Sequence, residues 1–375
     1  MKPLAVCVVM GTRPEAIKLA PVVIAARARP QEFSASVVRT GQHRELVDQL
    51  VREFDLPVEA DLQVMQPNQD LAHVMAESVR GLSGLFKRLR PDWVLVQGDT
   101  TSTFAGALAA FYHSIRIGHV EAGLRTGDRR SPFPEEANRA LTGRLADLHF
   151  APTERARQNL LREGVDDGAI LVTGNTIVDA LRLALASDAG AADPAAEKSP
   201  YVLATVHRRE SHGPALARIC DGLQALLTRR PDLTVWLPMH PSPQVRNTIE
   251  QRLGGHPRLR LTEPLGYKAF VRALGGAVLV LTDSGGIQEE CTALGKPVLV
   301  LRDRFRAFRA VAAGVAQLVG TQADCIAETA ARLLENIDGY RAMSRPSSAF
   351  GTGTAAHSIL EALLRWPRDA TGAPS

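Results

Sequence analysis

Short apolar runs, each followed by a polar turn and a helical stretch, recur along the chain. Seven of them are almost entirely apolar: Leu4–Val9, Trp93–Val96, Ile115–Val120, Tyr201–Val206, Thr234–Leu237, Ala277–Leu281 and Pro297–Leu301. Strands that are apolar at successive positions, instead of alternate ones, are typical of parallel sheets covered on both faces by crossover helices. The pattern therefore predicts an α/β fold with doubly wound parallel sheets flanked by helices.

A change in composition divides the chain. Between residues 183 and 200, Ala, Asp and Pro dominate, and no large apolar residue follows Leu185. This segment predicts a linker or variable surface loop between two Rossmann-like domains. We expect an N-terminal domain over residues 1–180, a C-terminal domain over residues 200–354, and a last helix over residues 355–368 that packs back on the first domain.

Composition and charge narrow the function classes. Of 375 residues, 45% are hydrophobic and 22% are charged, which is typical of a globular chain. The 44 basic residues nearly balance 40 acidic ones and only 5% are aromatic, so we expect no nucleic-acid partner and favour anionic small molecules. No apolar run approaches the roughly 20 residues that span a bilayer, and no signal-peptide pattern opens the chain. We therefore expect a cytoplasmic protein without a membrane partner.

Reactive polar residues follow the expected strands. In open parallel sheets, ligands bind outside the carboxyl ends of the strands. The residues at these ends include Gly11 to Arg13, Gly98, Asp99, Glu121, His207, His240 and Asp283 to Gly286. Because the ends belong to both halves of the chain, we expect a central cleft between two facing domains, lined by acid–base and anion-binding groups.

Two turns indicate anion binding. Pro14 suits a first helical turn, which places Arg13 at the helix entrance and Lys18 about one turn further, where both cations can reach a diphosphate. The Ser-Gly-Gly turn at residues 284–286 lets the main chain approach a phosphate, and Glu290 can accept hydrogen bonds from ribose hydroxyls. The alternatives are a solvated helix start and an ordinary strand-to-helix turn.

Three carboxylates are expected near one sheet edge. Asp99 and Glu121 end strands, whereas Glu135 lies in the first turn of a helix that begins at Pro134, with Arg139 four residues on, where the two can pair. Helix capping alone accounts for Glu135. Three carboxylates together indicate acid–base chemistry or a metal, and we favour the former because few other hard ligands are expected nearby.

No cofactor is expected. Residues 351–356, GTGTAA, match a dinucleotide fingerprint but follow a Pro- and Ser-rich stretch instead of a strand, so they predict no NAD site. The four cysteines are too far apart in sequence to form a zinc or redox motif.

Eight segments, in order over nearly the whole chain, resemble the non-hydrolysing bacterial UDP-N-acetylglucosamine 2-epimerases. They are GTRPEAIKLAPV, TGQHRELVDQ, GDTTSTFAGALAAFY, GHVEAGLRTGD, SPFPEEANR, TGNTIVDAL, HRRES, and LTDSGGIQEE with LGKPVLVLRD. The resemblance implies the two-domain GT-B-like fold, with UDP held by the C-terminal domain, and a homodimer. It also implies reversible conversion of UDP-GlcNAc to UDP-ManNAc, which supplies ManNAc for bacterial surface polysaccharides.

The same resemblance implies roles for individual residues. Its catalytic groups match Asp99, Glu121, Glu135 and His207. Its substrate contacts match Arg13, Lys18, Arg139, Phe270, Ser284, Gly285, Gly286 and Glu290. Segments that surround an allosteric UDP-GlcNAc in several bacterial members resemble those that contain Gln42, His43, Gln69, Arg208 and His240.

One segment departs from the family pattern. Members commonly read T-E-R-P-E after the LVLRD strand, whereas residues 304–310 here read RFRAFRA, with Ala307 at the position of the family's Arg. Arg306 or Arg309 can supply the missing charge; otherwise UDP binding weakens or the preferred sugar differs. Gln97 also replaces a common His.

The chemistry of the sugar favours elimination. The C2 hydrogen of GlcNAc is not beside a carbonyl, so no side-chain base can remove it directly. With no dinucleotide site for oxidation at C3, the residues favour loss of UDP to 2-acetamidoglucal and its re-addition, with the carboxylates transferring protons. The alternatives are a UDP-sugar glycosyltransferase of the same fold, a 2-epimerase of a modified UDP-sugar, and a non-catalytic UDP-sugar sensor.

Overall fold

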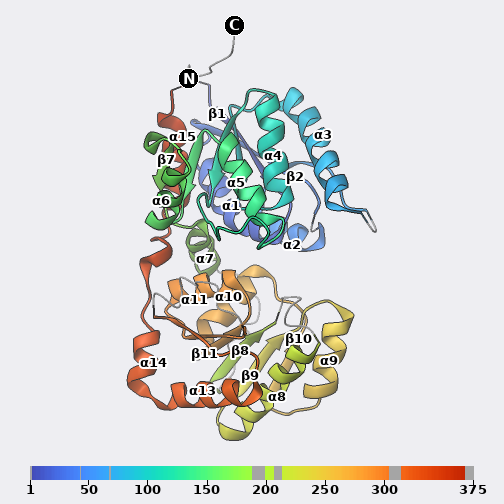
Figure 1. The fold of residues 1–375 in the computed structure, drawn as a ribbon, viewed down its shortest axis with the longest axis vertical. Helices are drawn as coiled ribbons and strands as arrows, with labels where there is room; N and C mark the ends of the chain where they lie inside the picture. Colours follow the sequence, from blue (N-terminus) through green and yellow to red (C-terminus); the bar gives the residue numbers. More distant parts are fainter. Residues whose placement is uncertain are drawn as a thin grey trace. The chain divides into compact units, whose positions relative to one another are not determined.

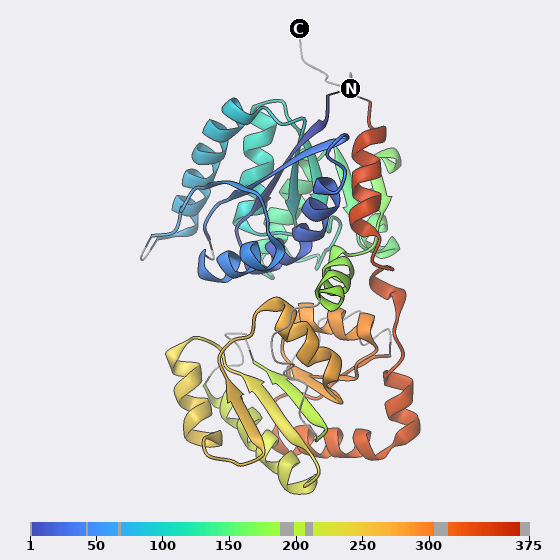
Figure 2. The same ribbon diagram turned by 180° about the vertical axis from the view of Figure 1, so that it is seen from behind.

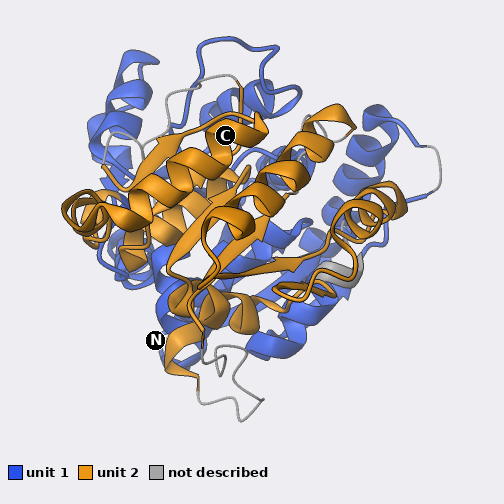
Figure 3. Cartoon of the chain, turned by 90° about the horizontal axis from the view of Figure 1, so that it is seen from below, with its two compact units in different colours: residues 1–183, 350–375 blue, residues 184–349 orange. Residues whose placement is uncertain are grey.

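The computed structural model describes residues 2–42, 44–66, 69–187, 199–206, 213–303 and 314–367, without the side chains of residues 44–46. The chain divides into two compact units, shown in Figure 3: unit 1 holds residues 1–183 and 350–375, and unit 2 holds residues 184–349. Each unit is built on one parallel sheet with flanking helices (Figure 1). The predicted α/β class with parallel sheets is therefore confirmed.

Unit 1 contains a seven-stranded parallel sheet in the order β3-β2-β1-β4-β5-β6-β7. Its strands are β1 (Leu4–Met10), β2 (Phe33–Arg39), β3 (Val58–Asp61), β4 (Trp93–Gln97), β5 (Arg116–Val120), β6 (Leu148–Ala151) and β7 (Ile170–Val172). Its helices are α1 (Arg13–Arg27), α2 (Arg44–Phe54), α3 (Leu71–Leu89), α4 (Thr101–Tyr112), α5 (Glu135–Leu145), α6 (Glu154–Arg162), α7 (Thr176–Ala186) and α15 (Ala355–Arg365). Helices α4 and α5 lie over the face seen in Figure 1, and α1 and α15 over the face seen in Figure 2.

Burial explains why the first strands form. All five residues of β4 and six of the seven in β1 are buried, as expected for strands covered on both faces. Helix α3 buries a stripe of residues three or four apart, Val74, Ser78, Leu82 and Leu85, against this sheet layer. Its N-terminus is capped by the Asp70 carboxylate, which accepts a hydrogen bond from the His73 main-chain N–H at 2.8 Å.

Unit 2 contains a six-stranded parallel sheet in the order β10-β9-β8-β11-β12-β13. Its strands are β8 (Tyr201–Thr205), β9 (Thr234–Pro238), β10 (Leu259–Thr262), β11 (Leu279–Thr282), β12 (Val298–Val300) and β13 (Ala316–Leu318). Its helices are α8 (Pro214–Arg229), α9 (Pro243–Leu253), α10 (Tyr267–Gly276), α11 (Gly285–Leu294), α13 (Ala323–Glu335) and α14 (Ile337–Met343). One apolar cluster contains residues of α8, α9 and α13, and a second contains residues of α10 and α11.

The strand order reverses once in each sheet. In unit 1 the chain leaves β1 toward β2 on one side and later adds β4 on the other; in unit 2 the same reversal separates β8 and β11. Such switch points leave a crevice outside the carboxyl ends of the two central strands, which is where open α/β sheets bind ligands. The topology therefore singles out the ends of β1 and β4, and those of β8 and β11.

All seven predicted runs form strands, with bounds that differ by at most two residues. Strand β11 starts two residues later than expected because Ala277 caps the end of α10. Six strands are not among those runs: β2, β3, β6, β7, β10 and β13. They are short or include polar residues, as in β2, which contains Ser34 and Ser36.

The last helix is attached to unit 1. Arg29 of the loop after α1 pairs with Glu361 of α15 at 2.8 Å, and the Trp366 ring meets Trp93 edge to face with 6.2 Å between centroids. Helix α7 continues to Ala186, beyond the start of the expected linker at Leu183. Most of that linker, residues 188–198, lies outside the described residues. None of the described helices is long and apolar enough to cross a membrane.

Candidate functional site

The turn after β1 is fixed by the carboxylate of Glu15. This buried group accepts hydrogen bonds from the main-chain N–H groups of Gly11 at 2.9 Å and Thr12 at 2.6 Å. It also accepts the hydroxyls of Thr100 at 2.6 Å and Thr103 at 2.9 Å, at the start of α4. Glu15 therefore joins the turn after β1 to the turn after β4.

Position 11 also requires a glycine for packing. A Cβ there would stand 2.0 Å from Ser102 Oγ and 2.4 Å from Thr40 Oγ1, in a space that two hydrogen-bonded hydroxyls already fill. Helix α1 begins directly after this turn, with Pro14 in its first turn as expected, and Arg13 lies half-buried at its start.

Glu121, the first residue after β5, is held by three donors. Lys18 Nζ reaches its Oε1 at 2.5 Å, Asn175 Nδ2 donates to the same oxygen at 2.8 Å, and Gln97 Nε2 donates to Oε2. Its φ of +63° is in the left-handed region, which costs a non-glycine residue free energy and is commonest at functional sites. The surrounding donors favour the ionised carboxylate.

Asp99, which follows β4, has a different environment. Its carboxylate pairs with Arg139 at 2.9 Å, while 31% of its side chain remains exposed. Burial by the surrounding groups raises the pKa of Asp99 to about 6; Arg139 opposes this rise and the charge of Glu121 adds to it. A carboxyl with this pKa can take up and release a proton near neutral pH.

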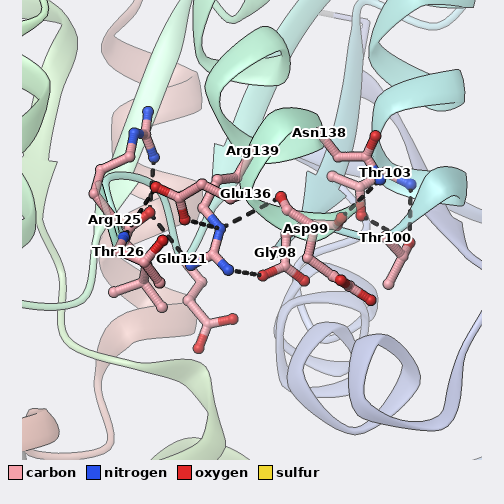
Figure 4. A network of polar contacts seen from close by, with 12 residues as sticks. Gly98, Asp99, Thr100, Thr103, Glu121, Arg125, Thr126, Glu136, Asn138 and Arg139 are labelled. Atoms are coloured by element: carbon pink, nitrogen blue, oxygen red, sulfur yellow. Dashed lines mark hydrogen bonds and ion pairs between the residues drawn. The ribbon is translucent and has the colours of Figure 1, made fainter. Parts of the chain in front are cut away.

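Arg139 links the carboxylates, as Figure 4 shows. The expected pairing with Glu135 is wrong: the guanidinium reaches only the main-chain carbonyl of Glu135, at 3.4 Å, and its ion pairs are with Asp99 and with Glu136, at 3.4 Å. Glu136 is 4% exposed and accepts the main-chain N–H groups of Thr126 at 2.9 Å and Gly127 at 3.1 Å. Glu135, predicted as a catalytic group, is half-buried in the first turn of α5.

Two buried histidines support this sheet edge from below. His119 of β5 and His149 of β6 are partners across the sheet and are 1% and 2% exposed. Burial lowers the pKa of His119 to about 3 and that of His149 to about 4, so both rings are neutral at pH 7. The His119 Nε2 lies 2.8 Å from the carbonyl of Gly98, and this contact holds the turn that presents Asp99.

In unit 2, the turn after β11 leads directly into α11. Ser284 stands at the N-cap, and its main-chain N–H donates to Thr282 Oγ1 at 3.0 Å; that hydroxyl also contacts Thr205 Oγ1 of β8 at 2.7 Å. A Cβ added to Gly285 or Gly286 would meet no protein atom within 4 Å. Neither glycine is therefore required by packing within the chain, and both leave the N-terminal N–H groups of α11 approachable.

Other predicted contacts of unit 2 lie in its interior. Glu290 of α11 is 5% exposed, and Phe270 of α10 is 9% exposed within the second apolar cluster. His240, after β9, accepts the Ser242 main-chain N–H on Nδ1 at 3.1 Å.

The residues predicted to surround an allosteric ligand have their own local contacts. In unit 1, Gln42 accepts the Ser102 hydroxyl at 3.0 Å, and Gln69 accepts the main-chain N–H of Gln66 at 2.6 Å. Five predicted features lie outside the described residues: His43, His207, Arg208 and the segment 304–310 with its Arg306 and Arg309.

Three residues of the site were not identified from the sequence. Glu15 and Asn175 stand inside quoted motifs, GTRPE and TGNTIVDAL, but nothing in the sequence distinguished them from their neighbours. Glu136 was passed over for the adjacent Glu135. Among the described residues, no group of three or more His, Cys, Asp or Glu side chains is arranged to hold a metal ion.

Comparison with known proteins identifies the family. The sequence model of the UDP-N-acetylglucosamine 2-epimerase family matches residues 24–364. The UDP-N-acetylglucosamine 2-epimerases of Escherichia coli and Bacillus subtilis are 47% and 44% identical over 371 and 367 residues, covering 96% and 97% of this chain and 98% and 96% of those proteins. A crystal structure of the UDP-GlcNAc 2-epimerase of Neisseria meningitidis bound to UDP-GlcNAc aligns with a TM-score of 0.87 at 40% identity, over 96% of this chain and 100% of that one. The chain therefore belongs to the UDP-N-acetylglucosamine 2-epimerase family of isomerases.

Proposed function

We propose that the protein interconverts UDP-GlcNAc and UDP-ManNAc by inverting C2 without a cofactor. The observation that carries this proposal is the pair of unlike carboxylates in unit 1, Asp99 with its pKa near 6 and Glu121 held by three donors. Proton removal and return at one carbon need a group that exchanges protons near neutral pH and a fixed charge beside it. The names of its relatives supply the substrate.

The reaction proceeds by elimination and re-addition. A carboxylate takes the proton from C2, the C1–O bond to UDP breaks, and a C1=C2 double bond forms, which gives 2-acetamidoglucal and UDP. UDP then adds back at C1 while a proton is delivered to the other face of C2. Asp99, Glu121 and Glu135 share these transfers, and Asp99 is the member whose pKa suits the exchange.

Departure of UDP needs positive charge and N–H donors. The start of α11, with Ser284 at its cap and two open glycines, supports binding of the diphosphate there. Arg13 at the start of α1 adds a second cationic helix start. Lys18 already binds Glu121, so its charge serves chiefly to keep that carboxylate ionised.

Several further properties are proposed on the family resemblance alone. They are the homodimer, activation by UDP-GlcNAc at a second site, a cytoplasmic location, and the use of ManNAc for surface polysaccharides. The roles of Arg139, Phe270 and Glu290 in substrate binding and of His207 in catalysis are proposed on the same ground.

Exchange at C2 tests the function directly. The purified protein is incubated with UDP-GlcNAc in heavy water, and C2 is followed by NMR. We expect deuterium at C2 and accumulation of UDP-ManNAc. A protein that binds UDP-GlcNAc but shows neither product nor deuterium after prolonged incubation is not an epimerase of this sugar.

A further inference from the structure

The side chain of Asn175 connects two parts of unit 1 that are far apart in sequence. Asn175 precedes α7 and is 2% exposed. Its Nδ2 donates to Glu121 Oε1 at 2.8 Å, and its main-chain N–H donates to the carbonyl of Phe350 at 2.7 Å. Phe350 is the residue at which the chain re-enters unit 1 from unit 2.

The orientation of the Asn175 amide is determined by its other atom. Oδ1 accepts the main-chain N–H of Ile177 at 3.1 Å, in the first turn of α7. Only an oxygen can accept this hydrogen bond, so the NH₂ group must face Glu121. The amide therefore acts as a donor toward the carboxylate and as a cap toward the helix at the same time.

The re-entering chain packs against Asn175 through two glycines. Gly174 and Gly351 have φ values of +83° and +104°, and a Cβ on Gly174 would lie 2.9 Å from the Cα of Gly351. Their backbones therefore touch with no side chain between them. Any displacement of Phe350 and Gly351 acts directly on the main chain of Asn175.

From these contacts we propose that Asn175 is a positioning residue, which sets the orientation of the Glu121 carboxylate and ties it to the segment where the chain returns from unit 2. This inference rests on the proposed function only in taking Glu121 as part of the reacting site. Asn175 itself need not touch the substrate. Because Glu121 has a left-handed backbone, the hydrogen bonds to its side chain decide where its charge lies.

The substitution Asn175→Asp tests the donor without removing the cap. A carboxylate retains an acceptor for Ile177 N–H but places a second negative charge against Glu121. We expect kcat to fall about tenfold or more at pH 8 with KM nearly unchanged, and to recover in part as the pH is lowered and the introduced carboxyl becomes protonated. A residue with a purely structural role would give no such recovery.

The matched control is Asn336→Asp. Asn336 caps α14 in unit 2 by accepting the Gly339 N–H at 2.9 Å, and aspartate caps equally well there. This variant introduces the same charge without a catalytic neighbour, so its pH profile should match that of the wild type. Thermal melting of both variants separates loss of folding from loss of positioning.

The link to the returning chain is tested with Gly351→Ala in both backgrounds. The added methyl presses on Gly174, so we expect kcat to fall several-fold in the wild type and to fall little further in the Asn175→Asp variant. Equal losses in the two backgrounds would show that Gly351 does not act through Asn175.

A structural readout keeps the inference independent of turnover. Crystal structures of the free wild type and of the Asn175→Asp and Asn336→Asp variants at pH 8 should show a rotated Glu121 carboxylate in the first variant only. An unmoved Glu121 overturns the positioning role. If the wild type shows no C2 exchange, the proposed function fails, and the crystal structures still decide the role of Asn175.

Discussion

The two units present the carboxyl ends of their central strands in opposite ways. In unit 1, the polar side chains at these ends already have protein partners: Glu15 accepts four hydrogen bonds, Glu121 three, and Asp99 pairs with Arg139. In unit 2, the turn at residues 284–286 consists of main chain and two open glycines. The difference separates a preorganised reaction site from an approachable anion site.

This separation assigns different failures to the two regions. A change in unit 1 should affect the chemical step, because its charges are fixed before substrate arrives. A change in the unit 2 turn should affect binding of the nucleotide. Each of the following substitutions tests one side of this division, beginning with the largest expected effect.

The substitution Asp99→Asn should nearly abolish turnover. Loss of the group with a pKa near 6 should lower kcat by about 10²–10⁴-fold while leaving the affinity for UDP, measured by calorimetry, unchanged. The control is Asp147→Asn: burial also raises the pKa of this carboxyl, but it precedes β6 at the opposite edge of the sheet, where it accepts the Ile117 N–H at 2.7 Å. A weakened affinity for UDP in the Asp99 variant would contradict the division.

A matched pair of glycine substitutions should separate binding from stability. We expect Gly286→Ala to keep its melting temperature and to raise the Kd for UDP about tenfold, because the methyl group enters the space left for a phosphate. Gly11→Ala should instead lower the free energy of unfolding by about 1–3 kcal/mol, since its methyl overlaps Ser102. Unchanged affinity for UDP in the Gly286 variant removes the anion site.

Replacing Arg139 should shift the pH dependence of the reaction. Its positive charge lowers the pKa of Asp99, so Arg139→Met should move that pKa above 6. If ionised Asp99 is the base, kcat/KM should fall several-fold between pH 6 and 7 and recover toward pH 9. Arg139→Lys retains the charge and should shift the acid limb less. An acid limb that stays in place in Arg139→Met would show that Asp99 does not govern it.

The smallest expected effect concerns the support of the unit 2 turn. Thr205→Val removes the hydroxyl that contacts Thr282, which in turn accepts the Ser284 N–H. We expect KM to rise about two- to fivefold with kcat unchanged, and the free energy of unfolding to fall by about 1 kcal/mol. Steady-state kinetics and chemical denaturation measure both. A fall in kcat alone would place this pair on the wrong side of the division.

Strand ends were the most predictable part of the molecule. Fully apolar runs revealed the central strands, and the residues after them included Asp99, Glu121 and the turn at 284–286. Parallel sheets place such ends together whatever the loop lengths, so the pattern is sufficient. Outer strands such as β2 and β6 were not recovered, because polar residues interrupt their apolar pattern.

Pairings within the site were not predictable to the same degree. Adjacent positions on a helix point about 100° apart, so the rotation of α5 decides that Glu136 is buried while Glu135 is not. The spacing of Glu135 and Arg139 allowed an ion pair, but the end of β4 offered Asp99 instead. Asn175 reaches Glu121 across 54 residues, and no local pattern encodes that contact.

The hydrogen bonds of Glu15 have a consequence for redesign of the anion-binding turn. All four of its partners are donors, so an amide in its place would direct N–H groups at other N–H groups, and a shorter carboxylate would not span the two strand ends. The neighbouring Arg13 takes no part in this fastening of the two turns. An engineer can therefore vary position 13 to accommodate another leaving group, whereas position 15 is a fixed point of the scaffold.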